Sequence, residues 1–283
     1  MKFVKLWGGL GNQMFQYSFG QYLNSVTKEV VVYVNHEGIC DLSSSSISGF
    51  NCSLKNNISE KHFLHYFNKW YRINRKALQL LPLLSNEILV ENLKKSFSEN
   101  SLHFVLFDGY WQDLKFVEFN RQSLKSIFTP MDAAIIQQSD FFSLVLNCET
   151  SVSVHIRRTD FLNSSYHNVL GLDYYQKAIL QVSVRVKNPV FFVFSDDIDW
   201  VKDHLHFNHL AYFVSEQNYQ QSMLTDFCLM SSCKHHIIAN STFSWWAAWL
   251  NDNYNKIVVA PKNWYRFNNE LAKRILPKEW ITL

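Results

Sequence analysis

Short apolar runs rich in β-branched and aromatic residues alternate with helical segments throughout the second half of the sequence, and this alternation narrows the possible folds most strongly. The predicted strands span 151–157, 190–195, 210–215, 235–239 and 256–260, and the predicted helices lie near 172–187, 197–205, 219–232 and 241–251. Strands that are separated by helices favour a parallel sheet with helices on both faces. We therefore expect an α/β fold.

The first half begins with a strand, a glycine-rich loop and a helix. Residues 2–7 alternate like a short strand, and the loop Gly8-Gly9-Leu10-Gly11-Asn12-Gln13 leads into a helical pattern. Glycines such as Gly9 and Gly11 let the backbone turn tightly or pass close to a ligand, although their spacing is not the dinucleotide-binding fingerprint. A second strand at 29–35 then completes a βαβ unit.

The length and the apolar content are sufficient for two domains. The chain has 283 residues, of which 47% are hydrophobic, and we divide it into domains 1–149 and 150–283. The first domain also contains a predicted strand at 103–108 and a helix-like, aromatic-rich stretch at 60–81. The tail from about 262 is expected to pack back on the body through Trp264, Tyr265 and Trp280.

Charge, cysteine content and hydropathy exclude several classes of protein. The net charge of +3 comes from Lys and Arg spread along the chain, so nucleic-acid binding is not indicated. The five cysteines show neither zinc-site spacing nor a disulfide framework, and we expect reduced thiols of a cytoplasmic protein. Because no apolar run approaches the ~18 residues needed to span a bilayer, we expect at most peripheral attachment to a membrane.

Polar clusters lie at the carboxyl ends of three of the predicted strands in the second half. They are His155, Arg157, Arg158 and Asp160 at the end of the first strand, Ser195-Asp196-Asp197 at the end of the second, and Asn240, Ser241, Thr242 and Ser244 after the fourth. The carboxyl ends of parallel strands lie along one edge of a sheet, where open α/β sheets bind their ligands. We therefore expect the three clusters to form one site.

An anion is expected in this site. Two adjacent guanidiniums beside a buried strand need charged partners, since buried charges without partners are costly. The helix that starts near Ser241 offers backbone N–H groups and a favourable dipole to a phosphate. Helix capping alone explains any single hydroxyl there, whereas the two arginines make a diphosphate the better explanation of the whole set.

The acidic pair Asp196 and Asp197 allows three interpretations. Asp197 and Asp199 have the Asp-x-Asp spacing of a metal site, the paired carboxylates suit the N–H edges of a nucleobase, and either residue suits a simple helix cap. A metal is less attractive, because two arginines already meet the charge of a phosphate and Asp199 should lie inside the helix.

Other candidate side chains have simpler explanations. A zinc role is not expected for three histidines in a polar connector, which lack ligands at the right spacing: His204, His206 and His209. Stacking on a sugar or a base competes with core packing for Trp245, Trp246 and Trp249. Their helical spacing favours the core for at least two of them.

Four motifs occur in order along nearly the whole chain. They are GGLGNQMFQYSFG at 8–20, VHIRRTD at 154–160, FSDDIDW at 194–200 and NSTFSWWAAWL at 240–250, and DGYWQDLKF at 108–116 accompanies them. Each motif alone is weak to moderate evidence, whereas the ordered set is highly specific. With this set the chain resembles the family 11 glycosyltransferases, the bacterial and animal α-1,2-fucosyltransferases, within the wider group that holds the α-1,6 and protein O-fucosyltransferases.

The resemblance implies a GT-B architecture, in which two Rossmann-like domains face a cleft and the second holds most of the donor, GDP-fucose. It implies that Arg157 holds the diphosphate and that His155 and Asp197 lie near the guanine. It also implies that Ser244, with its helix start, completes the phosphate cradle. Such a reaction needs no divalent metal and no further cofactor, in agreement with the charge argument above.

The sequence departs from the family pattern at two places. Thr159 stands where many members have Gly and in this respect looks like the α-1,6 enzymes, so the linkage is not read from this motif. The carboxylate proposed as the base in the α-1,6 enzymes falls near Ser164-Ser165, where the chain has no acid. The identity of the general base is therefore not carried over from the resemblance.

We expect transfer of L-fucose, with inversion, from GDP-β-L-fucose to the 2-hydroxyl of a terminal β-galactose. Arg157, Arg158 and the helix near Ser241 would stabilise the charge on the leaving GDP. Asp160 is the expected general base, and a salt bridge that orients Arg158 is its alternative role. Asn12 is expected to position the sugar or the acceptor.

The acceptor has no motif of its own. We expect a galactose-terminated glycan on a lipid-linked or lipopolysaccharide precursor, bound through the loop at 38–57 and the following helices. An α-1,6 or α-1,3 fucosyltransferase, another nucleotide-sugar transferase and a non-catalytic sugar-nucleotide binding protein remain as alternatives.

Overall fold

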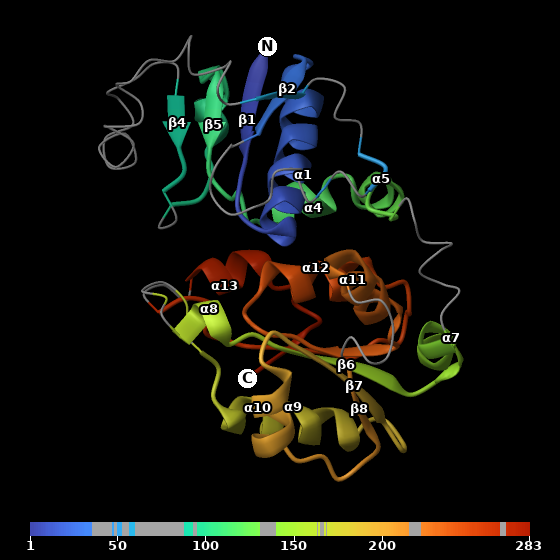
Figure 1. The fold of residues 1–283 in the computed structure, drawn as a ribbon. Helices are drawn as coiled ribbons and strands as arrows, with labels where there is room; N and C mark the ends of the chain where they lie inside the picture. The colour runs from blue at the N-terminus through green and yellow to red at the C-terminus, as the bar shows by residue number, and fades with distance from the viewer. Residues whose placement is uncertain are drawn as a thin grey trace. The chain divides into compact units, whose positions relative to one another are not determined.

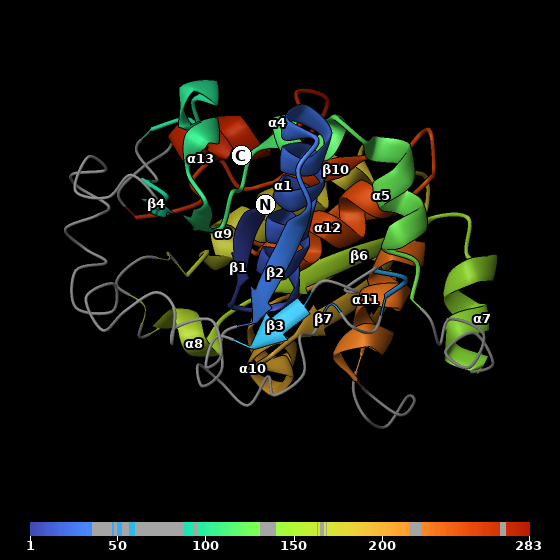
Figure 2. The same ribbon diagram turned by 90° about the horizontal axis from the view of Figure 1, so that it is seen from above.

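The computed structural model describes residues 1–35, 47, 50–52, 57–59, 88–92, 95–130, 140–162, 164, 167, 169–214, 222–266 and 270–283. They form two compact units, Met1–Thr129 and Pro130–Leu283, which Figures 1 and 2 show in two views. The boundary lies earlier than the one we expected between 149 and 150. The reason is helix α7 (Asp140–Asn147), which belongs to the second unit because the Phe141 ring packs 5.9 Å from the Phe192 ring.

The first unit is built on a five-stranded parallel sheet in the order β3-β2-β1-β5-β4. Its strands are β1 (Lys2–Leu6), β2 (Val31–Asn35), β3 (Asn57–Ser59), β4 (Ile88–Val90) and β5 (Leu106–Asp108). Its helices are α1 (Leu10–Thr27), α4 (Leu114–Glu118), α5 (Arg121–Ile127) and the 3₁₀ helix η3 (Glu99–His103). The crossover from β1 through α1 to β2 confirms the predicted βαβ unit. The short strands β3 and β4 were not predicted.

The turn into α1 requires glycine at its first position. Gly8 has a φ of +77°, and a Cβ there would lie 2.9 Å from the Asn12 side chain. The helix begins at Leu10, so Gly11 and Asn12 lie in its first turn and not in the loop where we predicted them. The tight turn therefore ends sooner than the glycine pattern indicated.

Aromatic rings form the core of the first unit around α1. The Phe19 ring stacks on the Trp111 ring with centroids 4.3 Å apart, and it meets the Phe107 and Phe116 rings edge-on at 5.5 and 4.8 Å. All four side chains are buried. Each buried aromatic ring of this kind adds packing energy beyond its area, about 0.5–1.5 kcal/mol per pair.

The second unit is built on a six-stranded parallel sheet in the order β11-β10-β9-β6-β7-β8. Its strands are β6 (Ser151–Ile156), β7 (Val190–Ser195), β8 (Ala211–Phe213), β9 (His235–Ile237), β10 (Val258–Ala260) and β11 (Ile281–Thr282). Its further helices are α8 (Thr159–Leu162), α9 (Leu172–Ser183), α10 (Ile198–His204), α11 (Met223–Ser232), α12 (Thr242–Leu250) and α13 (Glu270–Ile275). This confirms the α/β class and all five strands predicted in this half; β11 was missed.

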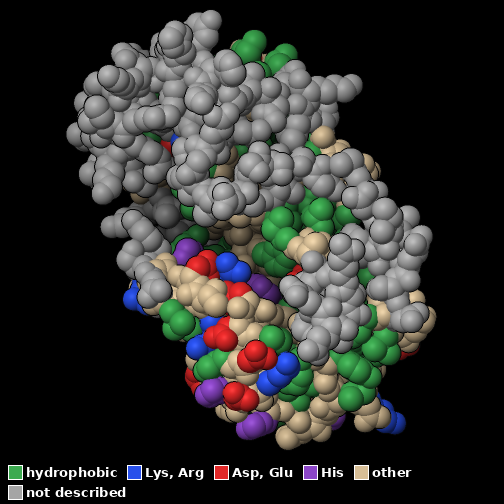
Figure 3. Space-filling model, in the orientation of Figure 1, with side chains coloured by type: hydrophobic (Ala, Val, Ile, Leu, Met, Phe, Trp, Pro, Cys, Tyr) green, Lys and Arg blue, Asp and Glu red, His purple; other side chains and the backbone are tan. Residues whose placement is uncertain are grey.

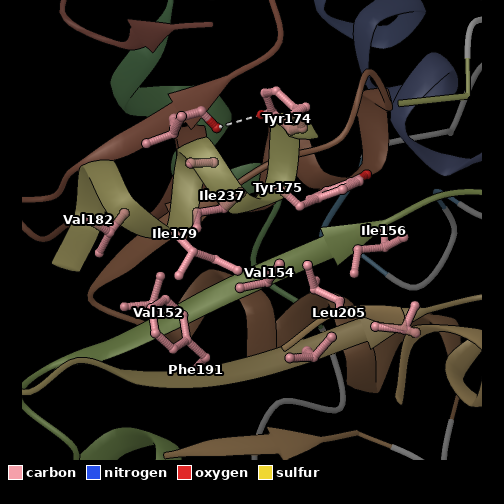
Figure 4. Packing of buried hydrophobic residues seen from close by; sticks show 14 of the residues in the cluster. Val152, Val154, Ile156, Tyr174, Tyr175, Ile179, Val182, Phe191, Leu205 and Ile237 are labelled. Carbon is pink, nitrogen blue, oxygen red and sulfur yellow. Dashed lines mark hydrogen bonds between the residues drawn. The ribbon is translucent and has the colours of Figure 1, made fainter. Parts of the chain in front are cut away.

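Strand β6 lies in the middle of the second sheet and is buried along its whole length. Figure 1 shows α9 and α10 on one side of this sheet and α11 and α12 on the other. Val154 and Ile156 of β6 pack with Ile179 and Val182 of α9 in the cluster shown in Figure 4. Burying each such side chain contributes about 1.5–3 kcal/mol to stability. The carboxyl end of β6 is therefore anchored in a well-packed core.

The tail packs back on the second unit, as expected. Trp264 and Trp280 are buried, and the Trp280 ring lies 5.7 Å from the Trp245 ring of α12. The indole N–H of Trp245 donates to the Ile275 carbonyl at 2.9 Å. The tail is therefore part of the core that supports α12.

Some predictions fall outside the described residues. They include the helix-like stretch at 60–81, Cys40 and most of the loop at 38–57. Within the described ranges, no helix is both long and apolar enough to cross a membrane. The four cysteines there are free: Cys52, Cys148, Cys228 and Cys233.

Candidate active site

The second unit brings the three predicted polar clusters to one edge of its sheet. Strand β6 lies between β9 and β7, and its register pairs Ile156 with Ser195 on one side and Val154 with Ile237 on the other. All three strands are parallel, so their carboxyl ends point to the same edge. The clusters after these strands therefore lie together, as the sequence predicted.

Arg157 leaves the end of β6 held by two carboxylates. Its Nε and one terminal nitrogen donate to the two oxygens of Asp160 at 2.8 and 3.0 Å, and Nε lies 3.4 Å from an oxygen of Asp196. The side chain remains 36% exposed. Asp160 thus pairs with Arg157, and the alternative that it orients Arg158 is wrong. A guanidinium that binds a carboxylate through Nε and one terminal nitrogen still has N–H groups that can donate to a ligand.

Arg158 is packed within the protein. Its Nε donates to Asp197 at 3.1 Å, and its guanidinium carbon lies 3.3 Å from the centre of the Trp200 ring. The side chain is 14% exposed. Arginines that pair with a carboxylate and stack on an indole are strongly fixed. The two neighbouring arginines therefore have different surroundings, and Arg157 is the more accessible cation.

Asp196 organises the turn between β6 and α8. Its two oxygens accept hydrogen bonds from the backbone N–H groups of Arg158 and Thr159 at 2.9 and 3.1 Å, and from the Thr159 hydroxyl. Asp197 occupies the N-cap position of α10 without a side-chain capping bond. Its carboxylate binds Arg158 instead, so the interpretation of Asp197 as a simple cap is wrong.

The metal interpretation finds no set of ligands among the described residues. No group of three or more His, Cys, Asp or Glu side chains there is placed to hold a metal ion. Asp199 lies inside α10, as expected, and pairs with Lys202 at 3.3 Å. On the face of the second unit seen in Figure 3, acidic and basic side chains intermix.

His155 is a buried polar residue of the site. The side chain is 6% exposed, and its Nδ1 has no hydrogen-bond partner. Burial, and then the charge of Arg157, lower the pKa of His155 to about 3, so the imidazole is neutral near pH 7. Its ring lies 5.8 Å from the Phe243 ring in the first turn of α12. This buried nitrogen next to the start of α12 is suited to a hydrogen bond with a ligand.

Helix α12 begins at the edge of the sheet with Ser241 as its N-cap. The Ser241 hydroxyl makes no capping bond, and Ser241 and Thr242 are half-buried. Asn240 fixes the preceding turn by donating to the Trp264 carbonyl at 3.1 Å. The Ser244 side chain is fully buried, and its hydroxyl donates to the Ser241 carbonyl at 3.2 Å. In this arrangement Ser241 and Thr242, and not Ser244, present hydroxyls at the helix start.

The aromatic and histidine side chains next to this site fall into two groups. The three indoles Trp245, Trp246 and Trp249 are fully buried, which confirms core packing for all of them. His204 is exposed and stacks on the Trp200 ring at 4.4 Å. Trp200 therefore lies between His204 and Arg158 as an organising aromatic residue that the sequence analysis missed.

The first unit holds the remaining predicted site residues. Gly9 is the exposed N-cap of α1, and a Cβ there would meet no atom within 4 Å. Gly11 is buried in the helix. Asn12 accepts a hydrogen bond from the Gln112 amide at 2.8 Å, so the motifs at 8–20 and 108–116 meet. The roles of these residues toward a ligand stay predictions.

His167 was also missed, since no motif surrounds it. Its ring stacks on the Phe161 ring of α8 with centroids 4.3 Å apart and lies 5.2 Å from the Tyr265 ring. The Arg266 side chain donates to the His167 carbonyl at 2.8 Å. The fold therefore brings the tail and α8 together around this histidine, which a sequence pattern does not reveal.

The sequence matches the family described as glycosyl transferase family 11 over residues 1–283. An alpha-1,2-colitosyltransferase of Escherichia coli is 33% identical over 99% of this chain and 98% of that protein. The O-antigen biosynthesis glycosyltransferase WbnK of Escherichia coli is 29% identical over 98% of both chains. The galactoside 2-alpha-L-fucosyltransferase SEC1 of Bos taurus is 32% identical over 47% of this chain and 38% of that protein.

A solved structure shares the fold. An Arg-to-Lys variant of Arabidopsis thaliana FUT1 in complex with GDP matches with a TM-score of 0.50 at 12% identity, covering 93% of this chain and 71% of that one. The GT-B class with two parallel-sheet units is thereby confirmed, while the cleft between them stays a prediction. The match along the whole chain, together with the strand-end site, leads to one conclusion: the chain belongs to glycosyl transferase family 11.

Proposed function

We propose that the chain transfers L-fucose, with inversion, from GDP-β-L-fucose to the 2-hydroxyl of a terminal β-galactose. One observation carries the proposal. The Arg157 guanidinium is fixed by Asp160 and Asp196 at the carboxyl end of β6, yet remains 36% exposed, and α12 starts after the neighbouring strand β9 at the same sheet edge. A cation and a helix N-terminus at one sheet edge suit a nucleoside diphosphate.

The geometry supports stabilisation of the leaving group. As the bond between the sugar and the β-phosphate breaks, negative charge builds up on the GDP oxygen. Arg157 is already oriented by its two carboxylates, so little reorganisation is needed at that moment. Loss of one preorganised donor of this kind costs about 3–4 kcal/mol of barrier by analogy with oxyanion donors.

His155 is the better candidate for contact with the nucleotide than either aspartate. Asp196 accepts two backbone N–H groups, and Asp197 binds Arg158. His155 has an Nδ1 without a partner in a buried position, and buried polar atoms generally have one. We place a hydrogen bond from the bound nucleotide there.

GDP-colitose is the second candidate donor. The observation in its favour is the 33% identity to an alpha-1,2-colitosyltransferase over 99% of the chain. Colitose differs from fucose by lacking the 3-hydroxyl. A site that binds this hydroxyl discriminates against the deoxy sugar by about 10⁴–10⁵-fold, whereas an apolar pocket discriminates weakly. Measuring kcat/KM with both donors therefore identifies the natural one.

For the acceptor we propose a galactose-terminated O-antigen precursor, handled at the cytoplasmic face of a membrane by a peripherally attached protein. WbnK, which is similar over 98% of the chain, is named for O-antigen biosynthesis, and the bovine relative is named for galactosides. We also propose that no divalent metal takes part, because Arg157 and the α12 start meet the phosphate charge. Activity retained in EDTA tests this.

The decisive experiment offers GDP-fucose or GDP-colitose with a panel of β-galactosides and assigns the product linkage by NMR. We expect an α-1,2 product. An α-1,6 or α-1,3 product would show that the proposed linkage is wrong, while the proposed sugar transfer from a GDP-sugar would stand. A protein that binds GDP yet forms no product with either donor would overturn the proposal and leave a non-catalytic nucleotide-binding protein.

A further inference from the structure

The proposed reaction needs a group that accepts the proton of the attacking hydroxyl, and the carboxylates of the site are already engaged. Asp160 grips Arg157 with both oxygens, Asp197 binds Arg158, and Asp196 accepts two backbone N–H groups. A carboxylate in an ion pair is a weaker base than a free one, because the cation favours its charged form. The proton acceptor should therefore be another residue.

His167 lies beside the Arg157–Asp160 ion pair. Its ring stacks face to face on Phe161, the residue next to Asp160 on α8, with an interplanar angle of 10°. The charges of Asp160 and Arg157 both act on the His167 ring. The contact of its ring with Tyr265 and the hydrogen bond from Arg266 to its backbone carbonyl also hold the histidine.

The hydrogen bonds of His167 leave one ring nitrogen for a substrate. Nδ1 lies 3.1 Å from the Ser164 hydroxyl, and Nε2 makes no hydrogen bond to the residues that the structure describes. When Nδ1 carries the proton and donates it to Ser164, Nε2 has a free lone pair. This is the tautomer in which a positioned histidine serves as a general base.

We infer that His167 is the general base of the proposed reaction and accepts the proton from the 2-hydroxyl of the acceptor galactose. The inference rests on the proposed function. The acceptor O–H bond breaks and its proton moves to Nε2, while the oxygen forms a bond to the anomeric carbon of the donor sugar. The bond from this carbon to the β-phosphate oxygen breaks, and its electron pair leaves with the nucleoside diphosphate toward Arg157. The histidine then releases its proton to solvent.

The protonation state of His167 agrees with this role. Burial lowers the pKa of His167, the negative charge of Asp160 opposes this, and the positive charge of Arg157 adds to it. Tyr265 faces the ring from the tail, and Arg266 binds the backbone. A histidine with a lowered pKa is neutral at pH 7 and is able to accept a proton. Activity should fall when acid protonates it.

The test compares His167→Gln and His167→Ala with His206→Gln, a matched change at an exposed histidine of the same unit. Loss of a general base lowers kcat by about 10²–10⁴-fold, and we expect this for both His167 variants with GDP affinity unchanged. The acidic decline of the wild-type pH–rate profile should disappear in His167→Gln. Added imidazole should restore part of the turnover of His167→Ala. His206→Gln should behave like the wild type.

Three outcomes would overturn the inference. Turnover of His167→Gln within about threefold of the wild type would exclude a general base of the usual strength. An acidic decline that persists in this variant would place the titrating group elsewhere, and loss of GDP binding would indicate a structural role. Failure of the proposed function is recognised separately, because then the wild-type protein itself forms no product with either GDP-sugar.

Discussion

The start of α1 in the first unit and the turn after β6 in the second both come directly after a buried parallel strand, yet different groups fix their backbones. At the start of α1 these groups are side-chain amides. Gln16 accepts from the Trp7 backbone N–H at 2.9 Å and donates to the Gly109 carbonyl at 3.0 Å, and Gln112 binds Asn12. At the end of β6 the holding groups are ion pairs between two arginines and three aspartates: Arg157 with Asp160 and Asp196, and Arg158 with Asp197.

This difference shows what each of the two regions is suited to. Neutral amides fix the backbone without creating a net charge, so the start of α1 is suited to a structural role. Ion pairs that leave one guanidinium partly exposed create a fixed positive charge, which suits an anion and the charge that develops on it. Substitution of the buried amide Gln16 should therefore act on stability, and substitution of Arg157 at the end of β6 should act on turnover.

The largest effect is expected from Arg157→Ala. Without the guanidinium, kcat with a GDP-sugar should fall by about 10²–10³-fold, while the free energy of unfolding changes little, because the lost ion pairs are partly exposed. Arg157→Lys should also be poor, since an ammonium does not grip two oxygens at once. Steady-state kinetics and urea unfolding measure the two quantities. Unchanged turnover in Arg157→Ala would show that the diphosphate does not bind at the end of β6.

Gln16→Leu should have the opposite signature. Gln16 is fully buried, and losing its two bonds to the backbone of Trp7 and Gly109 should lower the free energy of unfolding by about 2–6 kcal/mol, at ~1–3 kcal/mol per group. GDP binding by the folded protein should not change. Gln122→Leu, an exposed change on α5, is the control. Stability equal to that of the control would show that the amides are not what holds this region.

Acid should destabilise the second unit through buried histidines. The pKa of His155 is lowered to about 3 by burial and Arg157, and burial lowers the pKa of His236 far below its ordinary value. An unfolded histidine takes up its proton near pH 6.5, so stability is full above this pH. It then falls by about 1.4 kcal/mol per pH unit for each histidine as the pH drops toward the folded pKa.

Urea unfolding at pH 7 and pH 5 checks this expectation. In His155→Asn, the free energy of unfolding should depend less steeply on pH, by about 1.4 kcal/mol per pH unit. A pH-independent free energy of unfolding would show that the buried imidazoles are protonated or rearranged in the folded protein.

Much of the second unit was predictable because its strands combine apolar runs with polar residues at their ends. The strand at 190–195 is confirmed residue for residue as β7, and the clusters after β6, β7 and β9 do lie at one edge. Parallel-sheet geometry alone makes this inference possible. The strands β3 and β4 have three residues each, too few for any periodic pattern to emerge.

The pairing within the site was not predictable. Arg157 and Arg158 are neighbours in sequence, yet one pairs with Asp160 and the other with Asp197 and the Trp200 ring. Successive side chains at the end of a strand point in opposite directions, so which arginine meets which carboxylate depends on the turn that follows. His167 is held by ring contacts with Phe161 of α8 and with Tyr265 of the tail, and sequence spacing contains no sign of these contacts.

The smallest effect is expected from Asp160→Asn, and it separates an orienting role from a catalytic one. Asp160 is 56% exposed, so its ion pair with Arg157 should contribute less than about 1 kcal/mol to stability. Asparagine keeps the size and one acceptor but loses the charge. Arg157 is then held less firmly, and kcat should fall by no more than about tenfold. Asp203→Asn, an exposed change on α10, is the matched control.

The acidic decline of the pH–rate profile should remain in Asp160→Asn, because the proton is accepted by His167. A loss as deep as that of Arg157→Ala, together with disappearance of the acidic decline, would assign the base to Asp160 and reverse the roles of the two residues.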